Sequence, residues 1–290
     1  MKNIFMKNIG IVLALVAAFL YAFVYIIEKA YITKISSDKM LFLMYLGAAI
    51  GLFLIHSFTK TKTASENKIT RKEVPKVVLI VLCQLFSSIL LIEAIKIMNS
   101  SLVSILSVFE IVMTSLCAYF IFKDPIEKNE FIAIILVFFG GLILNFNVGS
   151  LSSINIGSLL MIAACFFWGV ENNITASISK KEPAFFTSIK CGSVALLYFI
   201  IMVSKGDISI EYPILILFGF LTYGLGVLSY ALSTRTLGAS KATLVFSFCP
   251  LFGSLLSFLI FKETITYTFI ISANLMIIGI MLMNHTIKKK

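Results

Sequence analysis

Apolar stretches recur along almost the whole chain, each about as long as a helix needs to cross a membrane. A bilayer core about 30 Å thick is spanned by roughly 20 apolar residues at about 1.5 Å per residue. Short polar or charged segments separate these stretches. The pattern predicts an all-α membrane protein with ten transmembrane helices, at residues 9–27, 40–58, 75–97, 100–122, 128–147, 156–179, 184–203, 213–234, 239–261 and 266–284.

The composition supports this interpretation and excludes a water-soluble domain. Hydrophobic residues make up 59% of the 290 residues, and charged residues only 13%. The net charge of +10 raises the question of nucleic acid binding, but the basic residues are spread through the short loops rather than along one face. We therefore expect the lipid bilayer, and no nucleic acid, as a partner.

The distribution of basic residues predicts how the chain is oriented. With a cytoplasmic N-terminus, 17 of the 24 Lys and Arg residues lie in inside segments and 6 in outside segments, while Lys190 lies within a span. The positive-inside rule then places both termini of a multi-pass protein in the cytoplasm, in the inner or plasma membrane of the cell. The first stretch leads into Glu28-Lys29 without a small-residue cleavage site, so we interpret it as a helix rather than a signal peptide.

The two halves of the chain match one another. Each half holds five of the predicted spans, and an odd number means that the second copy enters the membrane from the opposite side. We predict two inverted five-helix repeats, residues 1–148 and 149–290, whose packing can be exchanged so that a central site faces each side in turn. At an offset of 139 residues, the matched pairs are residues 118–124 with 257–263, Ser101 with Ser240, and Gly140 with Gly279. At a slightly larger offset, Ile9-Gly10 pairs with Ile156-Gly157 and Tyr21 with Trp168.

Three glutamates at membrane depth are functional candidates, because a charged side chain at mid-helix costs about 2.5–3.5 kcal/mol. Glu93 lies near the outer end of its helix, within reach of water or Lys96, and is interpreted as a mouth residue. Glu110 lies near mid-span. Glu171 has the richest setting, since helical spacing places it on one stripe with Trp168 and Thr175, with Asn172 adjoining.

Two further features bear on that candidate site. The matching positions of the first helix are aromatic but uncharged, at Tyr21 and Tyr25, so the site is expected to be asymmetric. Lys190 lies at a depth similar to that of Glu171. Three interpretations of Lys190 stay open: a structural ion pair, a direct role with substrate or protons, or an ammonium group that reaches the inner headgroups.

Taken together, the ten spans, the repeated Phe-Lys-acid motif ending at Asp124 and Glu263, and residues 168–175 resemble the EamA-type proteins of the drug/metabolite transporter (DMT) superfamily. The resemblance covers nearly the whole chain and implies two five-helix repeats and metabolite transport. The chain departs from the family in two places. Ile111 stands where the fourth helix often has proline, although Pro250 is kept in the ninth, and Lys-Asp and Lys-Glu replace Gly-Glu at the ends of these helices.

Other motifs concern packing and shape more than chemistry. Gly47 and Gly51 have the spacing of a helix-packing motif. Pro250 predicts a kink at the centre of the ninth span, and Tyr223-Gly-Leu-Gly226 permits bending or close approach in the eighth. The five cysteines all fall inside apolar spans without metal-like spacing, so we expect packing residues and no metal site.

The motif search leaves transport as the favoured function. The sequence has no phosphate-binding loop and no H-E-x-x-H motif, and its aspartates lie in loops, so we expect neither an enzyme nor a cofactor. We predict a secondary active transporter of small metabolites. By resemblance it is an exporter of amino acids or related compounds, with protons coupled through Glu110 or Glu171. An uptake carrier of the same fold, and a non-transporting sensor or a channel, remain as alternatives, and assembly as a homodimer stays open.

Overall fold

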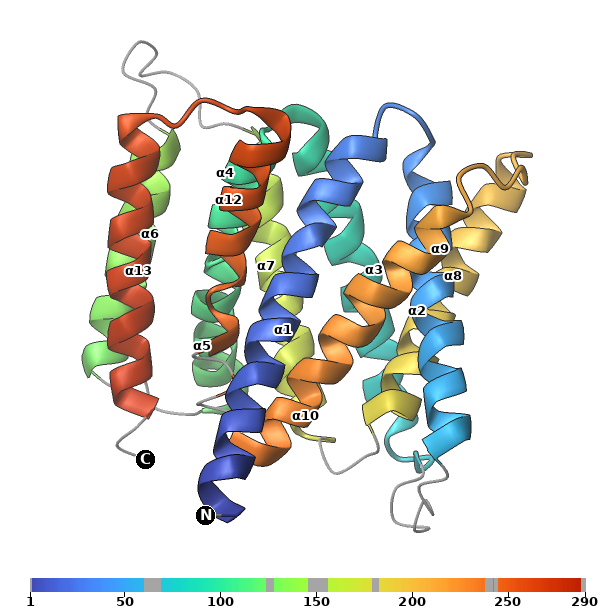
Figure 1. The fold of residues 1–290 in the computed structure, drawn as a ribbon, viewed down its shortest axis with the longest axis horizontal. Helices are drawn as coiled ribbons and strands as arrows, with labels where there is room; N and C mark the ends of the chain where they lie inside the picture. Colours follow the sequence, from blue (N-terminus) through green and yellow to red (C-terminus); the bar gives the residue numbers. More distant parts are fainter. Residues whose placement is uncertain are drawn as a thin grey trace.

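The computed structural model is an all-helical bundle over the residues that it describes, which are 2–59, 69–123, 128–145, 156–178, 183–237, 242 and 245–287. Helix α1 begins and α13 ends at the same end of the bundle (Figure 1). The helices are α1 (Lys2–Tyr31), α2 (Ser37–Thr59), α3 (Val74–Ile97), α4 (Ser100–Leu106), α5 (Phe109–Phe122), α6 (Lys128–Asn145), α7 (Ile156–Ala176), α8 (Pro183–Ser204), α9 (Ile214–Gly219), the π-helix η2 (Phe220–Gly226), α10 (Val227–Leu237), α12 (Cys249–Phe261) and α13 (Tyr267–Ile287).

Within the described residues, six helical segments are long and apolar enough to cross a bilayer, and three shorter apolar helices accompany them. The six correspond to the predicted spans one to four, seven and eight, and the shorter helices lie in the fifth, ninth and tenth. The sixth predicted span corresponds to α7, which carries the polar run Glu171-Asn172-Asn173. Large apolar side chains such as Phe53, Phe120 and Leu259 are more than half exposed, as expected of a surface that lipid covers.

Two of the predicted spans are broken near their centres at matching positions. The fourth divides at Ser107-Val108 into α4 and α5, and α12 begins at Cys249 directly after a turn at Ser247-Phe248. Pro250 accounts for the second break, because its ring and missing N–H cannot continue a helix that arrives from the N-terminal side. The kink predicted at Pro250 is therefore confirmed as a full interruption.

The break between α4 and α5 has no proline and depends on hydrogen bonds instead. The Ser107 hydroxyl donates to the Ser104 carbonyl at 2.6 Å, and the Ser104 hydroxyl donates to the Pro250 carbonyl at 2.9 Å. Because the carbonyl of Pro250 belongs to α12, the two breaks lie side by side and support one another. Interrupted helices leave backbone groups available at membrane depth, where they line cavities or bind ligands.

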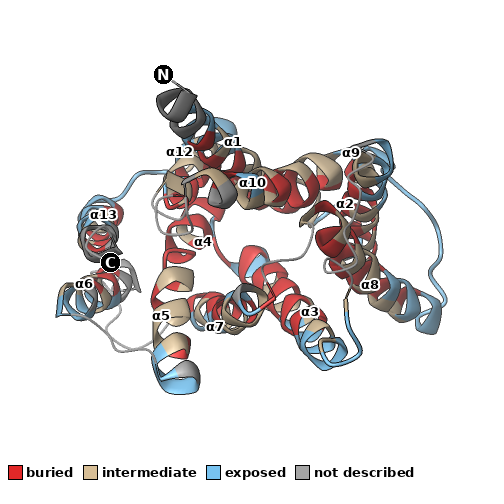
Figure 2. Cartoon of the chain, turned by 90° about the horizontal axis from the view of Figure 1, so that it is seen from below, coloured by how far each residue is buried: buried red, intermediate tan, exposed pale blue. Residues whose placement is uncertain are grey.

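Most helices pack mainly against helices from the other half of the chain. Helix α2 packs on α8, α6 on α13, and α4 on α12. Helix α3 packs on α7, and their counterparts in the other half, α10 and α1, also pack on one another. Helix α5 likewise packs on α7, and its counterpart α12 packs on α1. Figure 2 shows α6 beside α13 at one side of the molecule and α2 beside α8 at the other. The pattern stays unchanged when each helix of one half is exchanged for its counterpart in the other.

The pair α6 and α13 shows this exchange at atomic detail. A Cβ atom added at Gly140 would lie 3.0 Å from Met276 and 3.1 Å from the Ser272 carbonyl. A Cβ atom added at Gly279 would lie 2.9 Å from Val137 and 3.1 Å from the Ala133 carbonyl. All of these positions are related by the same offset of 139 residues that pairs Gly140 with Gly279 in the sequence.

The repeated Phe-Lys-acid motif ends a helix in both halves. Lys123 and Lys262 cap α5 and α12 in the left-handed conformation, with φ of 61° and 52°. The acid of the second copy, Glu263, accepts hydrogen bonds from the Ser100 and Ser101 amides at 3.1 and 3.2 Å and so caps the start of α4. Asp124, the acid of the first copy, lies outside the described residues.

The left-handed caps lead to a prediction about stability. A non-glycine residue in this conformation costs about 1–2 kcal/mol, so Lys123→Gly and Lys262→Gly should each stabilise the protein by about 0.5–1 kcal/mol. The thermal unfolding midpoint in detergent measures the effect. Lys96→Gly, within the last turn of α3, is the matched control and should lower the midpoint. A loss of stability in both cap variants would contradict the assigned backbone conformation.

Salt bridges join the loop after α8 to the start of α2. The Lys39 ammonium group lies 2.5 Å from Asp207 and 3.4 Å from Glu211, and Lys205 pairs with Asp38. The hydrogen bond from Lys39 holds the pKa of Asp207 below its usual range. These pairs tie together the ends of α2 and α8, whose lengths pack against one another.

Candidate functional site

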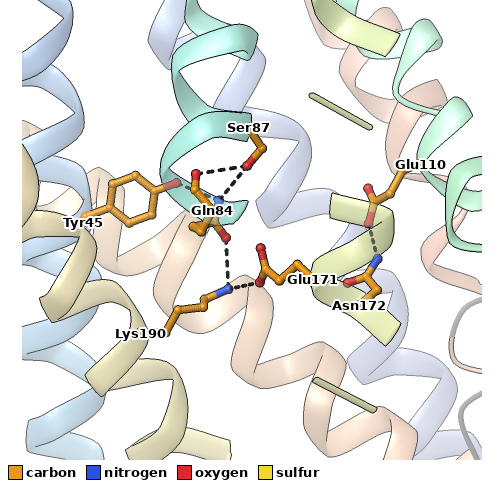
Figure 3. A network of polar contacts seen from close by, with 7 residues as sticks. All are labelled: Tyr45, Gln84, Ser87, Glu110, Glu171, Asn172 and Lys190. Atoms are coloured by element: carbon orange, nitrogen blue, oxygen red, sulfur yellow. Dashed lines mark hydrogen bonds and ion pairs between the residues drawn. The ribbon is translucent and has the colours of Figure 1, made fainter. Parts of the chain in front are cut away.

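A buried ion pair lies between α7 and α8. The Lys190 ammonium group is 2.8 Å from Glu171 Oε1, and the two side chains are 11% and 7% exposed. Lys190 also donates to Gln84 Oε1 of α3 at 3.0 Å (Figure 3). The similar depth predicted for Glu171 and Lys190 is therefore a direct contact, and the ammonium group points to the bundle interior rather than to the headgroups.

Gln84 extends this network from α3 to α2. Its amide nitrogen donates to Tyr45 Oη at 2.9 Å, and its carbonyl oxygen accepts from Lys190. Ser87, one turn further along α3, donates to the backbone carbonyl of Gln84 at 3.0 Å. Sequence reasoning missed both Gln84 and Tyr45 because it considered only charged groups at membrane depth, although an amide in the middle of a span is itself a rare and informative residue.

The run Glu171-Asn172-Asn173 joins α7 to two different neighbours. Glu171 faces Lys190 of α8, whereas Asn172 donates to Glu110 Oε1 of α5 at 2.9 Å (Figure 3). Asn173 donates to the backbone carbonyl of Thr114 at 2.9 Å and thereby fixes α7 against α5. Consecutive residues of one helix thus hold the two acidic candidates, Glu110 and Glu171, in one connected region.

Glu110 lies in the first turn of α5, directly after the helix break. The first amide groups of a helix have no partner within it and give that end a partial positive charge, which stabilises a carboxylate. Thr114 completes the local arrangement, since its hydroxyl donates to the Glu110 backbone carbonyl at 2.8 Å. The predicted mid-span acid is therefore located at the interruption between α4 and α5.

Two polar atoms of the predicted stripe are buried without a hydrogen-bond partner among the described residues. They are the indole nitrogen of Trp168 and Oε2 of Glu171. Trp168 is 5% exposed, and its position three residues before Glu171 places both on one face of α7. Buried polar atoms are nearly always paired, so unpaired ones facing the same region indicate a place where a ligand or water completes the set.

The remaining predicted site residues lie outside the network of Figure 3. Tyr25 is buried, and Tyr21 packs edge-on against Tyr223 and Phe246 at ring distances of 6.0 and 5.9 Å. Thr175 is half-buried on α7, one turn beyond Glu171. The roles predicted for these three residues stay predictions.

Glu93 and the cysteines are located where the sequence indicated. Glu93 forms an ion pair with Lys96 at 2.5 Å, and both side chains are well exposed, with fractions of 45% and 39%. All five cysteines are buried and free. Within the described residues, no cluster of three or more His, Cys, Asp or Glu side chains could hold a metal ion.

The fold and the site define a class of protein: a multi-pass helical membrane protein with a buried charged network between helices of its two halves. The model of the EamA-like transporter family matches residues 8–146 and again residues 155–285. The chain belongs to this family, which is part of the DMT superfamily.

Two further comparisons agree with this assignment. An uncharacterized transporter of Methanothermobacter thermautotrophicus is 26% identical over 188 residues, which are 60% of this chain. The matched region is 53% of that relative, so the chain spans about half of its length. A crystal structure of another protein matches with a TM-score of 0.70 over 97% of this chain and 98% of that one, at 10% identity, and so shares the fold.

Proposed function

We propose that the protein is a secondary active transporter of small metabolites, and that its substrates are amino acids or related compounds. The observation that carries the proposal is the buried pair of Glu171 and Lys190 beside two unpaired polar atoms, Oε2 of Glu171 and the indole nitrogen of Trp168. A zwitterionic substrate has an ammonium group for the carboxylate and a carboxylate for Lys190 and the indole N–H. Such a substrate would satisfy both free atoms without leaving a buried charge unpaired.

The mechanism we propose is alternating access by ten helices in two inverted repeats, residues 1–148 and 149–290. The reciprocal contacts of Gly140 and Gly279 and the matched breaks near Ser107 and Ser247 support this arrangement. Exchanging equivalent contacts between the halves would close one side of the central site and open the other. Export across the plasma membrane, with both termini in the cytoplasm, completes the proposal, and a homodimer remains an expectation.

Exchange of radiolabelled amino acids by purified protein in liposomes tests this function. We expect saturable exchange by wild type, and we expect Trp168→Phe to weaken substrate affinity about 2- to 10-fold, because one hydrogen bond to substrate is lost. The unfolding midpoint of this variant should fall modestly, because the smaller ring leaves space at a residue that is 5% exposed, although no hydrogen bond within the described protein involves the indole nitrogen.

Phe166→Leu is the matched control for that experiment. Phe166 is an aromatic residue of the same helix with an exposed fraction of 46%, so its replacement should leave affinity unchanged. Ion currents far above carrier rates would instead indicate a channel, and binding without exchange would indicate a sensor. Either outcome would contradict the proposed transport.

A further inference from the structure

Glu28 is a fully buried carboxyl group that the sequence did not single out. The apolar run ends at residue 27, but α1 continues to Tyr31, and Glu28 is 0% exposed. One carboxyl oxygen accepts a hydrogen bond from Tyr223 Oη at 2.7 Å. The other, Oε2, has no partner among the described residues. Its surroundings differ sharply from those of Glu171, which has a lysine.

No basic side chain neutralises Glu28 in the part of the chain that the structure describes. The adjacent Lys29 directs its ammonium group to the carbonyl oxygens of Ile95 and Met98, at 2.7 and 2.6 Å. A buried carboxylate without a counter-ion is far less stable than the neutral acid, whereas a buried ion pair such as that of Glu171 keeps its charge. Geometry therefore favours a proton on Glu28 in this conformation.

The helical segments that pack on α1 carry eight titratable residues. Among the described residues of the helices that pack on α1, only Tyr223 of η2 forms a hydrogen bond with the Glu28 carboxyl group, and α4 carries no titratable side chain. The titratable residues of the other neighbours are Cys249 on α12, Tyr230 and Arg235 on α10, and Lys76, Cys83, Glu93 and Lys96 on α3. The ring of Tyr45 of α2 stacks on that of Tyr223, at a distance of 4.7 Å between the ring centroids.

Tyr223 also connects Glu28 to the candidate substrate site. Its ring stacks on that of Tyr45, whose hydroxyl accepts from Gln84, and Gln84 accepts from Lys190. Tyr223 belongs to a π-helical segment, an irregular turn that is rare in proteins and frequent at functional sites. A change at one site can therefore reach the other through directly contacting residues.

We propose that Glu28, hydrogen-bonded to Tyr223, is the proton-binding site that drives this transporter. The carboxylate takes up one proton from the side to which it is open, the neutral acid is buried during the conformational change, and the same proton is released on the opposite side. This coupling role rests on the transport function proposed above, whereas the buried proton does not. A sodium ion fits poorly, because it needs several oxygen ligands and, among the residues that the structure describes, Tyr223 is the one polar side chain bonded to Glu28.

The first test needs no substrate. Because the folded protein would hold a proton that the unfolded chain releases, the unfolding midpoint of wild type in detergent should fall as pH rises between about 5 and 9. Glu28→Gln should flatten this fall. Glu93→Gln, which alters an exposed acid on α3, should leave it unchanged. An identical pH profile for Glu28→Gln and wild type would overturn the proposal, even if transport is observed.

The second test measures coupling in liposomes with radiolabelled amino acids. In Glu28→Gln we expect loss of accumulation driven by a pH gradient, while exchange at equal substrate concentrations persists. Tyr223→Phe, which keeps the ring stack and removes the hydrogen bond, should shift the pH dependence of driven uptake. Retained pH-driven uptake by Glu28→Gln, or driving by a sodium gradient in wild type, would overturn the proposal. Absence of exchange in wild type would instead count against transport itself.

Discussion

Glu171→Gln should abolish transport and lower the stability of the protein. Removing one partner of a buried ion pair leaves an uncompensated charge, here Lys190, at a cost of about 3–5 kcal/mol. The remaining hydrogen bond from Lys190 to Gln84 offsets only part of that cost. We expect a lowered unfolding midpoint, and at least about a 100-fold loss of amino acid exchange if substrate binds to this carboxylate, since 100-fold corresponds to about 2.7 kcal/mol.

The double variant Glu171→Gln/Lys190→Met separates a structural pair from a substrate site. Removing both charges should restore most of the lost stability, because no unpaired ion remains. Transport should stay absent if the pair binds substrate. Recovery of both stability and transport would show that the pair only holds α7 against α8 and would move the substrate site toward Glu110.

Gly219→Ala is expected to have the second large effect, this time on packing alone. An added Cβ atom would lie 1.9 Å from the Met44 carbonyl oxygen, a distance that the backbones of α2 and α9 cannot accommodate without moving apart. Overpacking of this kind costs about 1–3 kcal/mol or more. The unfolding midpoint in detergent and the yield of folded protein should both fall.

Gly192→Ala is the matched control for this glycine. The added Cβ atom would lie 3.6 Å from Ala49, an ordinary contact between α8 and α2. Because alanine favours a helix by about 1 kcal/mol over glycine, this variant should be neutral or slightly more stable. Equal losses in the two variants would show that the close approach of α9 to α2 is not what Gly219 provides.

The sequence predicted the helical class and part of the candidate site because both depend on local composition. Apolar runs locate the helices, and counting residues from the helix ends brings Glu171 and Lys190 to the same depth, where the structure places them in contact. The packing motif of Gly47 and Gly51 is likewise confirmed, since Gly47 approaches the Ile216 backbone and Gly51 the Phe220 ring.

Features that arise from tertiary contacts could not be predicted in this way. The break before α5 depends on hydrogen bonds that end at the Pro250 carbonyl of another helix, so no local signal marks it. From the sequence, Glu28 looks like the start of a loop because the apolar run stops before it, whereas in the structure it is buried and bonded to Tyr223 of η2, a helix distant in the sequence. Gln84 could have been found from the sequence, because it is a polar residue in the middle of a span, but a search for charged residues alone does not detect it.

The way in which the helices pair across the two halves has a consequence for biosynthesis. When the first five segments have left the ribosome, α2, α3 and α6 still lack α8, α7 and α13, the helices on which they mainly pack. The membrane must therefore hold these early segments with few contacts among them, and Gln84 and Tyr45 are made before their network partner Lys190. Assembly becomes favourable only as the second half of the chain is inserted, because the main packing contacts join helices of the first half to helices of the second.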